Sequence, residues 1–118
     1  MRISFLLPTI LVGLFALNNL ALAADESSAL LLIHDKQFEP NNLTIPAGIK
    51  VKIVIRNQDS LPTEFESTEL SREVIVPGHG EVTVFVGPLE PGSYQFFNDF
   101  NRDMRGVIVV KQGSNKGN

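Results

Sequence analysis

The chain of 118 residues contains no cysteine and no tryptophan, and it has only two histidines. Without cysteine, an exported protein of this size cannot be stabilised by disulfides, and no thiolate is present to act as a nucleophile or a metal ligand. A blue-copper centre, which requires a cysteine ligand, is therefore excluded. His34 and His79 stand far apart in the sequence, and they lack the paired spacing of a zinc site. Neither has a serine or cysteine partner in a recognisable nucleophile motif, so hydrolytic catalysis has no support.

An excess of positive charge and a helical pattern are also missing. Ten lysines and arginines against thirteen aspartates and glutamates give a formal net charge of −3. A mildly acidic surface gives no electrostatic reason to bind nucleic acid or anionic lipid. No window of useful length repeats its apolar residues with a helical period, so the sequence predicts an all-β protein.

The first 23 residues are predicted to be a signal peptide. Arg2 gives a positive start, residues 5–20 are uncharged and mostly apolar, and Ala21-Leu22-Ala23 places small residues at the positions that a signal peptidase reads. A membrane anchor is the alternative, but it needs roughly 20 unbroken apolar residues, and two asparagines interrupt this run. Cleavage after Ala23 would leave 95 residues with a net charge of −4, because Arg2 is lost. The short, simple signal is typical of bacteria and predicts a periplasmic protein with no stable membrane insertion.

Residues 24–111 are predicted to form one domain of short strands, followed by a flexible polar tail at 112–118. Strict alternation from Lys50 to Arg56 places aliphatic side chains on one face of a strand and mostly charged ones on the other. Further apolar or alternating runs occur at 29–33, 43–45, 73–76, 82–86, 93–97 and 106–110. Seven or eight short strands, with turn signals about every ten residues, are typical of an antiparallel β-sandwich.

Six segments of this region occur in a characteristic order. They are DKQFEP at 35–40, LTIPAG at 43–48, IVIRN at 53–57, EFES at 64–67, LEPGSYQFFNDF at 89–100 and RGVIVV at 105–110. Each segment alone is a weak signal, because similar turns occur in many sandwiches, but their order and spacing together are specific. Over residues 33–111 the chain resembles the cupredoxin-like domain of the EfeO type. The resemblance implies a Greek-key β-sandwich.

The resemblance also implies a function. Small exported members of this group are similar to the cupredoxin component of bacterial ferrous iron permease systems. This implies binding or oxidation of an iron or copper ion, with an inner-membrane iron permease and periplasmic iron-binding components as partners. An accessory role in iron oxidation stays open, although a redox enzyme would need an added copper site that the sequence hardly provides. The alternative is a metal-free sandwich that presents loops to a protein partner.

Glu64 and Glu66 flank Phe65 in the segment PTEFESTEL. In a strand, residues i and i+2 lie on the same face with Cα atoms roughly 6.5–7 Å apart, so both carboxylates are expected on one face and Phe65 in the core. The resemblance assigns this Glu-x-Glu pair to the metal site. The ordinary alternative is a solvent-facing strand whose acids bind nothing.

The loop from Asn98 to Met104 corresponds to the region where cupredoxins gather metal ligands. The resemblance implies cysteine or histidine in this loop, but the chain has Asn98 and Asn101. Phe38 likewise stands where some relatives carry a sulfur ligand. These departures argue against a high-affinity copper site.

The same loop still contains oxygen and sulfur ligands. Carboxylates from Asp99 and Asp103 suit hard divalent ions, whereas Met104 would favour copper. Core packing is the alternative role for Met104, and turn formation is the alternative for the aspartates, which Arg102 and Arg105 could also neutralise. The predicted metal ligands are Glu64, Glu66 and Asp99, with Met104 or Asp103 completing the shell.

Overall fold

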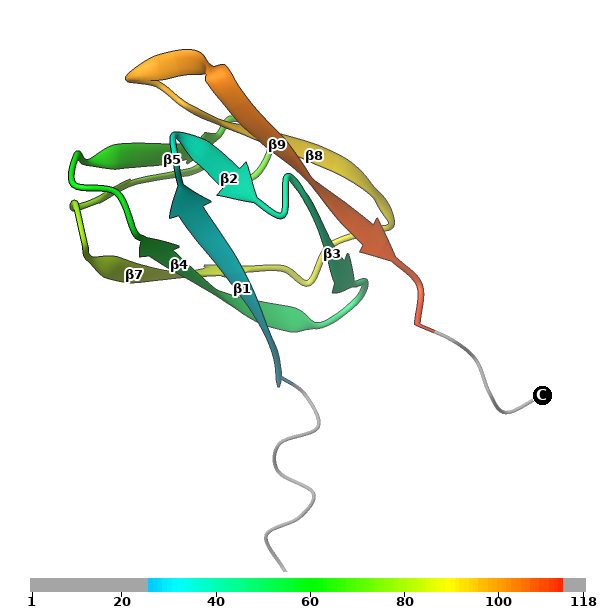
Figure 1. Cartoon of the computed structure of the whole chain (residues 1–118). Helices are drawn as coiled ribbons and strands as arrows, with labels where there is room; N and C mark the ends of the chain where they lie inside the picture. The colour runs from blue at the N-terminus through cyan, green and yellow to red at the C-terminus, as the bar shows by residue number, and fades with distance from the viewer. Residues whose placement is uncertain (1–25, 114–118) are drawn as a thin grey trace, which may run out of the picture.

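A computed structural model describes residues 26–113 of the chain (Figure 1). The predicted signal peptide, residues 1–23, lies outside the described residues, as does the predicted tail from residue 114 onward. No helix in the described part of the chain is long and apolar enough to cross a membrane.

Residues 26–113 form nine strands. Their bounds are β1 Glu26–His34, β2 Gln37–Glu39, β3 Asn42–Pro46, β4 Lys50–Asn57, β5 Thr63–Ser67, β6 Arg72–Val76, β7 Glu81–Val86, β8 Gly92–Asn98 and β9 Asn101–Lys111. The all-β prediction is confirmed. The strand that the sequence did not predict is β2, because three residues are too short to establish an alternating pattern.

The strands form two sheets, with the orders β2-β1-β4-β7 and β3-β9-β8-β5-β6. Figure 1 shows the two layers facing each other. The sandwich is mixed rather than wholly antiparallel, because β1 pairs with β4 and β3 pairs with β9 in parallel. A parallel pair needs a crossover connection, and the chain between β1 and β4 provides it by passing through β3 in the opposite sheet.

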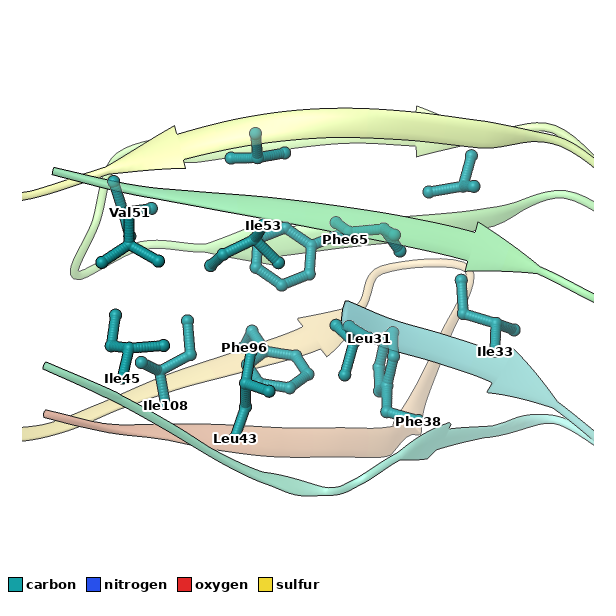
Figure 2. Close-up of a cluster of buried hydrophobic side chains, with 14 of the residues drawn as sticks. Leu31, Ile33, Phe38, Leu43, Ile45, Val51, Ile53, Phe65, Phe96 and Ile108 are labelled. Carbon is teal, nitrogen blue, oxygen red and sulfur yellow. The ribbon is translucent and has the colours of Figure 1, made fainter. Parts of the chain in front are cut away.

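The core lies between the two sheets and contains three aromatic rings that pack against one another (Figure 2). The ring of Phe96 lies 4.9 Å from that of Phe38 and 5.0 Å from that of Phe65, measured between centroids. Gly106, opposite Phe96 on β9, leaves room for this packing, since a Cβ there would lie 2.4 Å from the Phe96 ring. Phe65 is fully buried, which confirms its predicted inward orientation.

Candidate metal centre

Strand β5 presents its two glutamates on the outer face of the five-stranded sheet. Because Phe65 points into the core, alternation turns Glu64 and Glu66 away from it. On that face Glu66 pairs directly with Glu73 of β6 on one side and with Phe97 of β8 on the other. The outer face of β5 is therefore bordered by a third carboxylate and by an aromatic ring.

The turn between β8 and β9 brings a further carboxylate to this face. Asn98 pairs with Asn101, whereas Phe97 pairs with Arg105, so β9 contains an irregular segment just after the turn. The Oδ1 atom of Asn98 accepts hydrogen bonds of 3.0 Å from the backbone N–H groups of Glu64 and Phe100. This buried amide ties the turn, and with it Asp99, to the start of β5. The predicted loop is thus a tight turn and a bulged strand.

Three carboxylates meet where the turn covers β5. Glu64, Glu66 and Asp99 each offer a carboxylate oxygen, and these oxygens all lie within 4.8 Å of one another. Oxygen ligands that share a hard cation, at bond lengths of about 2.0–2.6 Å, are separated by no more than about 5 Å. The arrangement is therefore compatible with a common cation. These three residues are the part of the predicted ligand set that the structure brings together.

Glu64 is buried although its side chain is on the outer face. It is 5% exposed, and its Oε1 atom is buried without a hydrogen-bond partner among residues 26–113. Burial raises the pKa of Glu64 to about 7, with the neighbouring Glu73 side chain and the negative charges of Glu66 and Asp99 as further causes. A buried carboxylate oxygen of this kind lacks the partner that such groups normally have.

Glu73 is the member of this acidic group that the sequence analysis missed. It lies directly opposite Glu66 and raises the pKa of Glu64. The register of the β5–β6 hairpin could have identified Glu73. A turn over residues 68–71 pairs Ser67 with Arg72, and this pairing places Glu73 beside Glu66.

Asp103 and Met104 are the two remaining predicted ligands, and Asp103 is not one of the grouped carboxylates. The Met104 side chain is 6% exposed, and its Sδ atom lies 3.4 Å from the donating Nδ2 of Asn98. It lines a hollow of about 400 Å³ at the end of the sandwich, next to Leu61 and Phe100. Asp103 is exposed and borders a different hollow. The sulfur atom of Met104 is therefore engaged by the Asn98 amide.

Two arginines flank the acidic group. Arg102 forms an ion pair with Asp99, and its guanidinium lies 5.2 Å from the centroid of the Phe97 ring. The guanidinium of Arg105 lies 5.8 Å from the same ring. Of the two cations, Arg102 is the one that contacts a carboxylate of the group.

Comparison with known proteins places the chain in a family. The family described as "Cupredoxin-like domain" matches residues 7–110. An uncharacterised protein of Rickettsia prowazekii is 40% identical over 81 residues, which are 68% of this chain and 65% of that protein. The iron uptake system component EfeO is 32% identical over 98 residues in Yersinia pseudotuberculosis and 30% identical over 104 residues in Escherichia coli. These matches cover 79% and 84% of this chain but only 25% and 27% of EfeO.

Solved structures agree on the fold. A purple cupredoxin from Nitrosopumilus maritimus superposes with a TM-score of 0.56 at 20% identity, covering 70% of this chain and 99% of that one. The metal-binding domain of the Cu(I)-exporting ATPase CopA from Streptococcus pneumoniae gives a TM-score of 0.64 at 16% identity, covering 75% and 88%. With the two-sheet topology and the match over most of its length, the chain belongs to the cupredoxin-like domain family, in the EfeO type.

Proposed function

We propose that this domain binds a hard divalent metal ion, ferrous iron in its cellular setting, through the carboxylates of Glu64, Glu66 and Asp99. The observation that carries the proposal is the buried Oε1 atom of Glu64, which lacks a hydrogen-bond partner in the described chain and belongs to a group of oxygens within 4.8 Å of one another. A cation at their centre would give this atom its partner.

The energetics of the acidic group favour a cation. Carboxylates at this separation repel one another, and burial adds a desolvation cost to the ionised form. A proton on Glu64 relieves both effects in the metal-free protein, in line with its pKa of about 7. A divalent cation relieves them for all three carboxylates at once. Glu73, beside Glu66, adds negative charge and would strengthen the attraction.

The ligand types favour iron over copper. Carboxylate oxygens suit hard cations, whereas Cu(I) prefers thiolate and thioether sulfur. The chain has no cysteine, and Met104 is held by Asn98 rather than by the carboxylates. The name of the EfeO relatives, iron uptake system component, also supports iron. We therefore do not include Met104 or Asp103 among the ligands of this site.

The same relatives and the predicted signal peptide support a cellular role. We infer that the chain is exported to the periplasm after cleavage behind Ala23. There it would capture a metal ion for an inner-membrane iron permease, together with other iron-binding components. Since the chain spans only about a quarter of EfeO, we assign to it the binding step and not the activity of a whole EfeO protein.

Thermal unfolding with added metal tests the proposal. A ligand that binds the folded state raises its stability by RT ln(1 + [L]/Kd), so ferrous iron without oxygen, or Mn²⁺, should raise the melting temperature. The double variant Glu64→Gln, Glu66→Gln should abolish this rise. The matched control is Glu81→Gln, Glu90→Gln, which removes two exposed carboxylates outside the acidic group and should leave the rise intact.

Two results would count against the site. One is a wild-type protein whose melting temperature no ion changes. The other is a double variant at positions 64 and 66 that responds as the wild type does. The first result would favour a metal-free interaction module, and the second would show that the ion binds elsewhere on the protein.

A further inference from the structure

We propose that Arg102 is a built-in counter-ion of the acidic group, which competes with the metal ion for Asp99 and thereby limits the affinity of the site. The inference rests on the proposed metal site. It adds a residue that sets how strongly the site binds and how it distinguishes ions by charge.

The contacts of Arg102 place its positive charge on one of the proposed ligands. Its Nε and Nη2 atoms lie 2.9 and 2.6 Å from the same oxygen, Oδ1 of Asp99. Asp99 is also one of the three residues whose oxygens gather within 4.8 Å. The guanidinium therefore contacts the same carboxylate that a metal ion at the centre of the group would bind.

The ion pair between Arg102 and Asp99 can be broken at low cost. The side chains of Arg102 and Asp99 are 69% and 39% exposed, and exposed ion pairs are weak. The guanidinium also lies over the Phe97 ring, at 5.2 Å from its centroid. A cation over an aromatic face is attracted by the ring, so Arg102 keeps a favourable contact when a metal ion takes Asp99.

Arg105 provides a matched comparison within the same strand. It has the same charge and lies over the same ring at 5.8 Å. Its Nε donates a hydrogen bond of 3.1 Å to the backbone carbonyl of Arg102, and among the described residues it forms no ion pair with the acidic group. Removal of either arginine deletes one positive charge near the site, but only Arg102 competes directly for a ligand.

The size of the effect follows from the charges. We take a distance of about 6 Å between the guanidinium and the metal ion, and a dielectric constant of about 80. Removal of the arginine charge then raises the affinity about 3-fold for each unit of positive charge on the metal ion. Arg102→Gln should therefore lower the Kd about 10-fold for a divalent ion and about 30-fold for a trivalent ion. Because a loss of structure would not scale with ion charge, this ratio identifies an electrostatic role.

The experiment measures Mn²⁺ and Tb³⁺ binding to the mature chain at low ionic strength, by calorimetry and by Tb³⁺ luminescence. Arg102→Gln should bind both ions more tightly, with the larger gain for Tb³⁺. Arg102→Lys keeps the charge and should stay within about 3-fold of the wild type. Arg105→Gln should show a smaller gain than Arg102→Gln for both ions. At about 0.5 M salt the differences should shrink, because the screening length falls to about 4 Å.

The outcomes separate this inference from the proposed function. If the wild type binds both ions and Arg102→Gln binds them equally or more weakly, Arg102 does not compete for Asp99 and the inference alone is wrong. Equal gains for Arg102→Gln and Arg105→Gln would also overturn it, since general charge would then explain the effect. If neither the wild type nor Arg102→Gln binds either ion, the metal site and the inference fall together.

Discussion

The pH dependence of folding should reverse its sign when a metal ion binds, and Glu64 should be the cause. The pKa of Glu64 is raised from 4.5 to about 7 in the folded protein, mainly by burial. The folded state therefore holds a proton on Glu64 that the unfolded state has released between these two values. The contribution of Glu64 to the free energy of unfolding is therefore fully present below pH 4.5, and it is lost as the pH rises through 7.

The magnitude follows from the shift and from the surroundings. A full shift of this size corresponds to at most about 3 kcal/mol. The exposed neighbour Asp99 lets water screen part of the interaction, so we expect the metal-free protein to lose about 1–2 kcal/mol between pH 5 and pH 8. Asp59 has a lowered pKa because the backbone N–H of Lys36 donates to its carboxylate, and its contribution changes only below this range.

Urea unfolding at pH 5 and pH 8 in the presence of EDTA measures this loss. Glu64→Gln cannot ionise, so its stability should be nearly the same at both values, whereas the control Glu81→Gln should behave as the wild type does. With saturating Mn²⁺ the wild type should instead be more stable at pH 8, because carboxylate ligands must be deprotonated to bind metal. A metal-free wild type that gains stability from pH 5 to pH 8, or a Glu64→Gln variant with an unchanged pH dependence, would show that Glu64 does not cause the pH dependence.

Three further predictions concern the fold, the turn and export. Phe65→Ala should destabilise the domain by about 3–5 kcal/mol in urea unfolding, because it leaves a cavity beside Phe96; an unchanged midpoint would contradict the core assignment. Asn98→Ala should cost about 1–3 kcal/mol and weaken Mn²⁺ binding, because the buried N–H of Glu64 loses its acceptor; full affinity would show that the turn needs no such anchor. The exported protein should begin at Ala24, and an intact mass that retains the first 23 residues in the membrane fraction would contradict cleavage.

The sequence was sufficient to predict the strands other than β2 and the direction of the side chains on β5. Alternation with a period of two is a local property, so the inward position of Phe65 and the shared face of Glu64 and Glu66 could be derived from neighbouring residues alone. The wholly antiparallel arrangement was wrong for two strand pairs, because parallel pairing depends on which sheet the intervening strands join.

The burial of Glu64 could not be derived in this way. It depends on the β8–β9 turn, which the Asn98 side chain anchors to the backbone of Glu64, and a contact over 34 residues of sequence leaves no periodic signal. The position of Glu73 depends on hairpin register, which the sequence analysis did not assign. The ion pair of Asp99 depends on the irregular pairing of β9 after Asn101, which brings Arg102 back to the turn. Of the other predicted ligands, Asp103 is not one of the grouped carboxylates, and the sulfur atom of Met104 contacts the Asn98 amide.

The proposed function requires that one metal ion lies among the carboxylates of Glu64, Glu66 and Asp99. Anomalous diffraction from crystals of the mature protein grown with Mn²⁺ tests it most directly. We expect one anomalous peak at about 2.0–2.6 Å from a carboxylate oxygen of each of these residues, and we expect the peak to be absent in the Glu64→Gln, Glu66→Gln variant. A peak beside Met104 at the end of the sandwich, or a wild-type crystal with no peak at the carboxylates, would contradict it.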